Sequence, residues 1–154
     1  MTDSKDIDVL LKFCEEQYIW CRHSESERST MTNFIITIAA ALVAFIGYVG
    51  FDIKVIPSGF FLLVLGIYGT LMTLKYHERF RLHLRLAGEW ANKIDEICPN
   101  ANLNSLTKKA FQEHRKKYSK LSEIKLSKLW VFIHILISLL GLAFIIIGIL
   151  PFFI

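Results

Sequence analysis

The sequence predicts an all-α membrane protein with three transmembrane helices, a cytoplasmic helical hairpin and an N-terminal cytoplasmic helix. Hydrophobic residues make up 53% of the 154 residues, and the mean hydropathy is +0.42. Three long blocks contain no Asp, Glu, Lys or Arg, namely 31–50, 55–74 and 129–154. Each block reaches the roughly 20 residues that a helix needs to cross a bilayer. This composition excludes a disordered chain and makes a soluble nucleic-acid-binding module improbable.

The blocks divide the chain into six expected parts. Residues 1–30 form a lead-in helix, 31–50 the first transmembrane helix and 51–54 a short outer loop. The second transmembrane helix, 55–75, is expected to continue as a cytoplasmic helix to residue 97, because no proline separates the two parts. Residues 98–128 form a second cytoplasmic helix, and 129–154 form the third transmembrane helix.

The distribution of basic residues predicts the orientation. Four Lys and Arg residues lie in 1–30, one in 51–54 and thirteen in 75–128. Segments rich in Lys and Arg stay in the cytoplasm, so the N-terminus and the 75–128 segment are expected on the cytoplasmic side of the membrane and the C-terminus on the outer side. Residues 1–30 have a net charge of −3 and residues 75–128 a net charge of +7. Lys75, Lys125 and Lys128 lie at membrane edges, where they fix the topology or contact anionic lipid.

The lead-in segment has the periodicity of an amphipathic helix over residues 4–23. Its apolar face comprises Ile7, Leu10, Leu11, Cys14, Tyr18 and Cys21. Ser24 and Glu27 have the spacing of a capping box, so a new helix is expected to begin there. The cysteines include no CxxC pair, so no metal or redox site is expected.

A seam with alternating spacing of three and four runs through the second transmembrane helix and its cytoplasmic continuation. Such spacing is typical of a helix that packs along a partner helix, within the chain or in another subunit. We assign to this seam Gly59, Leu62, Gly66, Gly69, Thr73, Tyr76, Phe80, His83, Ala87, Trp90, Ile94 and Ile97. The basic stretch from Ser105 to Leu126 is the expected partner of the 76–97 part, in an antiparallel hairpin.

A second stripe with the same spacing lies on the first transmembrane helix: Thr30, Asn33, Thr37, Ala40, Ala44 and Gly47. Polar groups in lipid are costly and usually face protein or water. The stripe therefore lines a pore in an oligomer or forms a seam that packs against another helix. A weaker face of Ser138, Gly141 and Gly148 lies on the third helix, with His134 near its cytoplasmic entrance.

Basic residues on the cytoplasmic segments are candidates for binding an anionic ligand such as a nucleotide or oligonucleotide. We single out Arg79, Arg81, Arg85, Lys108, Lys109, Arg115, Lys116 and Lys117. The alternative is a set of solvated helix faces. The sequence has no Gly-rich phosphate loop, HExxH motif or nucleophile elbow. We therefore expect no enzymatic activity, no catalytic residue, no cofactor and no metal.

Residues 4–97 resemble SLATT, a two-helix membrane effector domain of bacterial anti-phage defence. The similarity lies in the order of segments, in Glu27-Arg28 before the first transmembrane helix and in Tyr76-His77-Glu78-Arg79 after the second. The channel of the Hailong defence system and small membrane proteins of CRISPR loci are similar in plan. The resemblance implies a pore that depolarises the cell when a nucleotide signal changes.

These observations predict an oligomeric pore in the inner membrane, gated by a cytoplasmic anionic ligand or a partner protein of a defence system. Two other classes remain open. A non-conducting adaptor would use the same cytoplasmic helices to recruit a soluble partner. A holin-like lysis protein fits the small size and the basic content.

Overall fold

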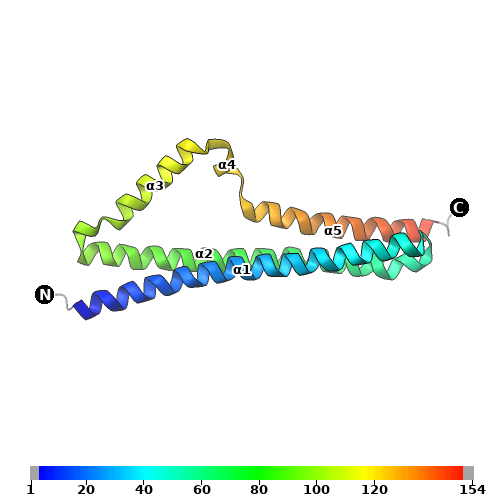
Figure 1. The fold of residues 1–154 in the computed structure, drawn as a ribbon, viewed down its shortest axis with the longest axis horizontal. Coiled ribbons are helices and arrows are strands. Elements are labelled where there is room, and N and C mark those ends of the chain that lie inside the picture. The colour runs from blue at the N-terminus through cyan, green and yellow to red at the C-terminus, as the bar shows by residue number, and fades with distance from the viewer. Residues whose placement is uncertain (1–3, 151–154) are drawn as a thin grey trace. The chain divides into compact units, whose positions relative to one another are not determined.

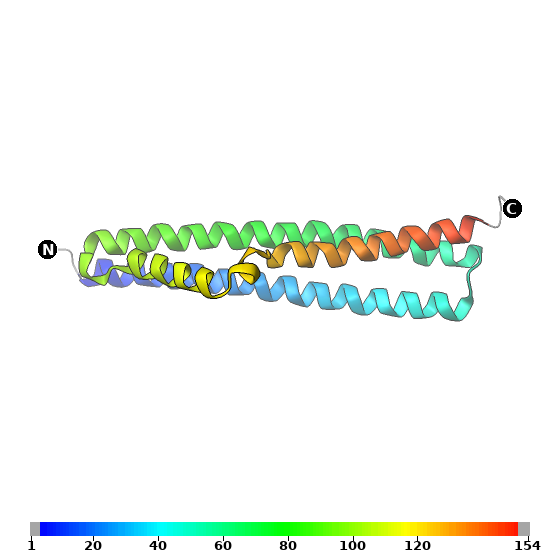
Figure 2. The ribbon, with the colours of Figure 1, turned by 90° about the horizontal axis from the view of Figure 1, so that it is seen from above.

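The computed structural model describes residues 4–150, and every regular element in that range is a helix. Figure 1 and Figure 2 show the ribbon in two views. The elements are α1 (Ser4–Val49), η1 (Ile53–Val55), α2 (Ile56–Ile97), η2 (Pro99–Ala101), α3 (Leu103–Lys117), α4 (Ser119–Glu123) and α5 (Leu126–Ile149). The expected parts at residues 1–3 and 151–154 lie outside the described residues.

Three of these helices, α1, α2 and α5, are long and apolar enough to cross a membrane. Each contains a stretch of at least 18 residues with a mean hydropathy of 1.9 or more. Their composition and length indicate a multi-pass membrane protein.

Helix α1 runs without a break, so the expected start of a new helix at Ser24 is wrong. The Ser24 hydroxyl donates a hydrogen bond to the Trp20 carbonyl oxygen, 2.9 Å away, inside the helix. A serine in this arrangement bonds to the preceding turn and leaves the downstream amides to the helix itself. Because no glycine or proline lies between Ser4 and Ile46, nothing in the backbone interrupts α1.

The chain divides into two compact units, and α1 and α2 contribute to both. The apolar unit consists of residues 27–76 and 126–150, and the polar unit consists of residues 4–26 and 77–125. Each unit has its own helix–helix packing.

In the apolar unit, parts of α1 and α2 pack with α5 around a small core. The buried core residues are Ala39, Ile46, Val55, Leu62 and Phe144. Glycines allow α2 and α5 to approach closely, since a Cβ atom added to Gly59 would lie 2.9 Å from the Gly141 carbonyl oxygen. Such contact between backbones is typical of helices that associate in membranes.

A short turn joins α1 to α2 at one end of the apolar unit. The Asp52 side chain caps η1 by accepting a hydrogen bond from the Lys54 amide at 2.7 Å. Gly50 has a φ of +90°, a backbone conformation that favours glycine. Pro57 lies in the first turn of α2, where its missing N–H is not needed.

In the polar unit, the first part of α1 packs antiparallel to the last part of α2. Phe13 stacks on Trp90 with ring centroids 5.5 Å apart. Further along α1, Cys21 donates its thiol hydrogen to the Phe80 carbonyl oxygen at 3.7 Å. As the residue number rises on α1, the partner number falls on α2, which establishes the antiparallel direction.

The expected hairpin between residues 76–97 and 105–126 is therefore wrong, because α1 occupies the seam of α2. Helix α3 leaves the end of α2 at an open angle (Figure 1), and no residue of α3 is buried. Several residues of the seam are buried within the chain, among them Leu62, Thr73, Ala87 and Ile94. The periodicity of the seam did not identify which segment covers it.

Residues 98–128 form several elements, which corrects the expectation of one helix. The last turn of α3 holds Arg115, Lys116 and Lys117, whose charges interact favourably with the negative end of the helix dipole. Tyr118 leaves the helical conformation with a ψ of 46°, and Ile124 is extended. Helix α5 then begins at Leu126, three residues before the predicted apolar block.

A carboxylate connects α3 to α2 within the polar unit. Asp95 accepts hydrogen bonds from the backbone amides of Leu103 and Asn104, at 2.8 and 2.9 Å, and from the Asn104 side chain at 2.8 Å. These bonds lower the pKa of Asp95 below its ordinary value, and the bond from the Asn104 backbone amide has the largest effect. Asp95 thereby satisfies amides at the start of α3 that have no partner within the helix.

Candidate functional site

The predicted stripe on α1 lies on the outside of the apolar unit. Its six residues are all exposed: Thr30, Asn33, Thr37, Ala40, Ala44 and Gly47. A Cβ atom added to Gly47 would meet no atom within 4 Å. The stripe therefore takes no part in the packing of α1 against the other helices of its own chain.

A different face of α1 makes the contacts with α2 and α5. Its buried residues are Arg28, Thr32, Ile35, Ala39 and Ile46. This face also has spacing of three and four, and it also contains small and hydroxyl-bearing residues. The helix thus carries two stripes that could pack, of which the chain itself buries one.

Three polar side chains, Thr30, Asn33 and Thr37, give the exposed stripe its chemical character. The Thr37 hydroxyl donates a hydrogen bond to the Asn33 carbonyl oxygen at 2.9 Å, so its donor is satisfied within the helix. The Asn33 carboxamide has no hydrogen-bonding partner among residues 4–150. A carboxamide carries two donors and an accepting oxygen, so Asn33 requires water or a polar group from another molecule.

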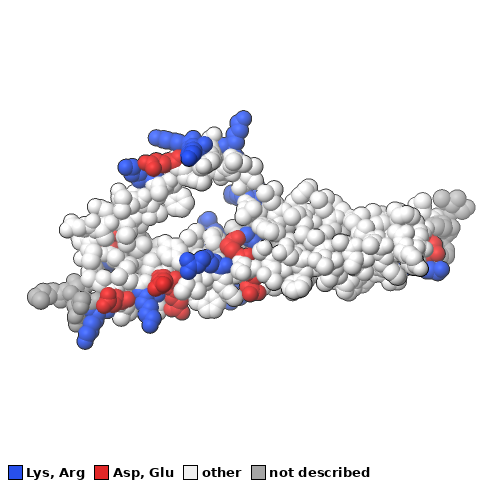
Figure 3. All heavy atoms as spheres, in the orientation of Figure 1, with Lys and Arg blue, Asp and Glu red and all other residues white. Residues whose placement is uncertain are grey.

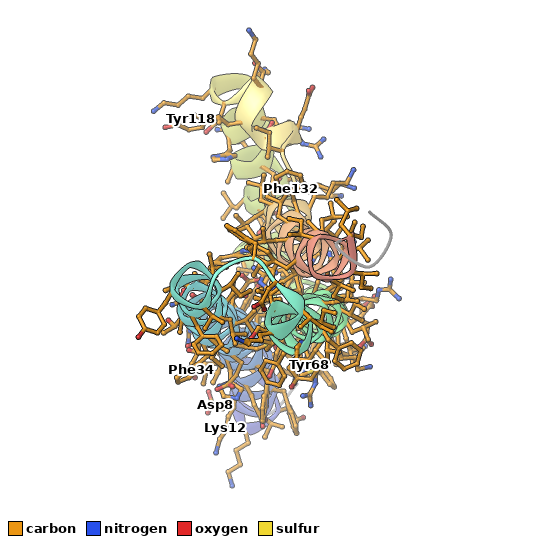
Figure 4. All side chains as sticks on the ribbon, turned by 90° about the vertical axis from the view of Figure 1, so that its right-hand side faces the viewer. Asp8, Lys12, Phe34, Tyr68, Tyr118 and Phe132 are labelled. Atoms are coloured by element: carbon orange, nitrogen blue, oxygen red, sulfur yellow. The ribbon has the colours of Figure 1, made fainter. Side chains whose placement is uncertain are left out.

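The rest of the outer surface of the apolar unit suits lipid. Phe34, Tyr68 and Phe132, from α1, α2 and α5, point outward in Figure 4 and are each at least half exposed. The only charged residues of this unit are Glu27, Arg28, Asp52, Lys54, Lys75 and Lys128. All six lie near the ends of the apolar segments, and Figure 3 shows a broad uncharged surface between them.

The seam of α2 faces inward in both units. In the apolar unit, Gly66 lies against Ser138 and Gly69 lies against the His134 ring. Leu62 and Thr73 have no exposed surface.

In the polar unit, the His83 Nδ1–H donates to Gln17 Oε1 at 2.8 Å, and the Trp20 ring stacks on the His83 ring. Ala87 and Ile94 are buried. The seam residues thus find partners within the chain on α5 and α1.

A buried polar layer in the apolar unit was not predicted from the sequence. His134 Nε2 lies 3.2 Å from Thr32 Oγ1, and neither side chain has exposed surface. Helices α2 and α5 run antiparallel, with Gly66 against Ser138 and Gly69 against His134. One turn further along α2, Thr73 therefore lies at the level of Trp130. Among the described residues, Thr73 Oγ1, Trp130 Nε1 and His134 Nδ1 are buried without a hydrogen-bonding partner.

Arg28 completes this layer from α1. Its guanidinium carbon lies 5.7 Å from the centre of the Trp130 ring, in the range of a cation–π contact. The only sequence signal for the layer was the presence of Thr32, Thr73 and His134 in apolar segments. Polar residues in such segments usually face protein, but their spacing could not show that they meet.

The predicted anion-binding residues lie on two elements. Arg79, Arg81 and Arg85 are exposed on α2, whereas the remaining five are exposed on α3. Of the eight, Arg115 lines a described pocket, an open hollow of about 470 Å³ that also involves Ser119, Ser122, Glu123 and Lys125. The structure thus gathers no single nucleotide site from the predicted set.

The cysteines of α1 are structural thiols. Cys14 donates to the Ala87 carbonyl oxygen at 3.8 Å, as Cys21 does to Phe80. Burial raises the pKa of both thiols, and the nearby Glu25 raises the pKa of Cys21 further. A raised pKa keeps a thiol protonated and unreactive at neutral pH. Within residues 4–150, no three His, Cys, Asp or Glu side chains are grouped so that they could hold a metal ion.

Comparisons with protein-family models, with curated proteins and with solved structures found no match to this chain.

Proposed function

We propose that the protein forms a homo-oligomeric pore in a bacterial inner membrane, with the exposed stripe of α1 turned toward the centre of the assembly. The observation that carries this proposal is the position of the stripe outside the packing of its own chain. Thr30, Asn33 and Thr37 supply polar groups that can face water in a pore. Ala40, Ala44 and Gly47 have small side chains that let neighbouring helices approach closely.

The energetic argument concerns the Asn33 side chain. In an isolated chain within a bilayer, its carboxamide would face lipid without a hydrogen-bonding partner. A carboxamide buried in hydrocarbon without a partner costs roughly 2–7 kcal/mol, and Asn33, two residues inside the 31–50 block, bears only part of that cost. An assembly that turns the stripe inward removes this cost, because water or a neighbouring Asn33 then accepts and donates the missing bonds.

The orientation follows from the charges. The polar unit carries most of the Lys and Arg residues and is proposed to lie in the cytoplasm, with the α1–α2 turn on the outer side. The short turn at Asp52 and Lys54 contains only one basic residue, so its charge does not oppose a position on the outer side of the membrane. The resemblance to SLATT-type effectors supports a conducting assembly over a non-conducting adaptor.

Ion flux from liposomes reconstituted with the purified protein tests the proposal. Replacing Asn33 and Thr37 by Leu makes the lining apolar and is expected to abolish most of the flux, while the oligomer persists in light-scattering measurements of the purified protein. The matched control replaces Phe34 and Ile38 by Leu. These residues are exposed on another side of the same turns of α1, and their replacement should leave the flux unchanged.

Each other outcome contradicts part of the proposal. Wild-type flux from the Asn33→Leu/Thr37→Leu variant would show that the stripe does not line the pore. Loss of the oligomer in that variant would identify the stripe as a packing seam. An assembled wild-type protein without flux would favour the adaptor.

A further inference from the structure

Helix α3 has one apolar side that the chain leaves uncovered. At 100° per residue, the residues on this side are Leu103, Leu106, Ala110, Phe111 and Tyr118, and the opposite side carries Lys108, Lys109 and Lys116. Leu106 is 60% exposed and Phe111 65% exposed. The two largest apolar contributions of α3 are therefore open to solvent.

The Asp95 contacts hold the start of α3 away from the bilayer. Lys75 is the first charged residue after the apolar stretch of α2, and Asp95 lies twenty residues further along the same unbroken helix. At 1.5 Å per residue, this separation is about 30 Å. The exposed apolar side of α3 thus faces water, where leucine and phenylalanine side chains favour burial against another apolar surface.

A second uncovered apolar patch lies on the α1–α2 pair of the polar unit. Phe13 stacks on the partly exposed Trp90 and is itself 46% exposed. Val9 lies one turn from Phe13 on α1, and Leu86 lies one turn from Trp90 on α2. Both are also exposed. We call these four residues the aromatic patch.

The exposed ring of α3 lies at the level of the aromatic patch along α2. Phe111 comes eight residues after the start of α3, so it lies at most about 12 Å from the level of Asp95. Figure 1 shows α3 running back over α2 at an open angle, so Phe111 lies between the levels of Asp95 and Ala87, eight residues back on α2. Trp90 and the Phe13 ring stacked on it lie within that range.

This shared level matters in a membrane oligomer. The copies in a closed ring are related by rotation about one axis, and when that axis is normal to the bilayer every copy lies at the same depth. Phe111 of one copy is then level with the aromatic patch of the next. Within one chain, α3 diverges from α2 and none of its residues is buried. A neighbouring copy can therefore supply the apolar surface that α3 lacks.

The two surfaces also differ in the sign of their charge. Residues 4–26 contain five acidic and three basic residues, and residues 77–97 contain four of each, so the α1–α2 pair has a net charge of −2. Residues 103–125 contain seven basic and two acidic residues, a net charge of +5. Contact between α3 and the α1–α2 pair of another copy brings opposite charges together, whereas contact between two α3 helices would bring like charges together.

We propose that α3 of each copy docks on the aromatic patch of the next copy in the oligomer. Phe111 and Leu106 contact the neighbouring copy's Phe13 and Trp90. Because two different surfaces meet, the contact is heterologous and can close into a ring. The inference rests on the homo-oligomer of the proposed function but not on ion conduction.

Photo-crosslinking of the full chain in lipid nanodiscs tests this contact. Phe111 is replaced by p-benzoylphenylalanine, a photoreactive analogue of phenylalanine. Unlabelled and ¹⁵N-labelled chains are mixed in detergent before reconstitution, so that a crosslinked peptide pair with one label of each kind must join two copies. We expect such mixed pairs between position 111 and the peptides that contain Phe13 or Trp90.

Two leucines of α2 provide a matched pair of variants. Leu86→Asp places a charge in the aromatic patch and is expected to remove most of the mixed pairs. Leu84 is similarly exposed but lies on another side of α2, so Leu84→Asp should leave the yield unchanged. Moving the photoreactive residue to Lys109, on the opposite side of α3, should also remove most of the product. Circular dichroism shows that each variant keeps its helices.

The other outcomes separate this inference from the proposed function. Absence of mixed pairs in a protein that light scattering shows to be oligomeric would overturn the docking of α3 and leave the oligomer standing. Pairs that carry only one kind of label would mean that α3 covers the patch of its own chain. Crosslinks to lipid alone would place α3 on the membrane. A monomeric protein would overturn both the proposed oligomer and the docking.

Discussion

Thr32 and His134 join α1 to α5 through a hydrogen bond of 3.2 Å in the interior of the apolar unit. Both side chains have no exposed surface. Replacing Thr32 by Val keeps the shape but leaves His134 Nε2 without a partner, which is expected to lower the free energy of unfolding by about 1–3 kcal/mol. Denaturation of the purified protein in mixed micelles measures this change.

The neighbouring Thr30 provides the control for that substitution. Thr30→Val alters the same residue type two positions away, on the exposed stripe. It should change the stability of the isolated chain by no more than about 0.5 kcal/mol. Equal losses in the two variants would contradict the role assigned to the Thr32–His134 bond.

Glycine substitutions distinguish a packed helix face from an exposed one. A Cβ atom at Gly141 would lie 2.6 Å from the Gly59 carbonyl oxygen, so Gly141→Ala must separate α5 from α2. We expect a loss of about 1–3 kcal/mol in the free energy of unfolding.

A Cβ atom added to Gly88 would meet no described atom within 4 Å. Because alanine favours the helix more than glycine does, Gly88→Ala should stabilise α2 by up to about 1 kcal/mol. Thermal unfolding followed by circular dichroism compares the two variants. Stabilisation by Gly141→Ala would refute the close α2–α5 contact.

The Asp95 contacts give the attachment of α3 a defined pH dependence. Hydrogen bonds from Asn104 and Leu103 hold the pKa of this carboxyl below its ordinary value. The attachment is therefore fully stabilising above the ordinary pKa of an aspartate and weakens as the pH falls through the lowered value. Amide exchange at Leu103 and Asn104, corrected for intrinsic rates, should accelerate over this acidic range.

Asp95→Asn tests whether the carboxylate causes that pH dependence. The variant keeps an accepting oxygen but does not titrate. It should show faster exchange at neutral pH and no further loss of protection on acidification. If the wild-type pH profile persisted in the variant, another group would control the attachment.

Thiol alkylation tests the packing of α1 on α2 in the polar unit. Cys21 is 5% exposed and donates to the Phe80 carbonyl oxygen, whereas Cys98 is partly exposed beyond the end of α2. Burial raises the pKa of Cys21, which lowers its thiolate fraction at neutral pH.

Maleimide labelling followed by mass spectrometry should therefore modify Cys98 well before Cys21 in the folded protein. Denaturation should remove most of the difference between the two residues. Rapid labelling of Cys21 in the folded protein would show that the α1–α2 pairing opens.

Features that depend on one segment alone could be predicted from the sequence. Uncharged runs of about 20 residues predicted three helices able to cross a membrane, because hydropathy and length are local properties. The continuous seam and the absence of proline between Pro57 and Pro99 predicted that α2 runs as one helix as far as Ile97. The break at Tyr118 was missed because no glycine or proline marks it.

The tertiary structure decided which surfaces meet. Periodicity shows that a helix has a packing face, but it does not identify the partner. The seam of α2 therefore fitted residues 105–126 as well as α1, and only the contacts of Phe13, Gln17 and Cys21 selected α1. Likewise, α1 carries two stripes of small and polar residues, and the packing buried Thr32 while leaving Asn33 exposed. Burial of one stripe depends on complementary surfaces from distant segments, which no local pattern contains.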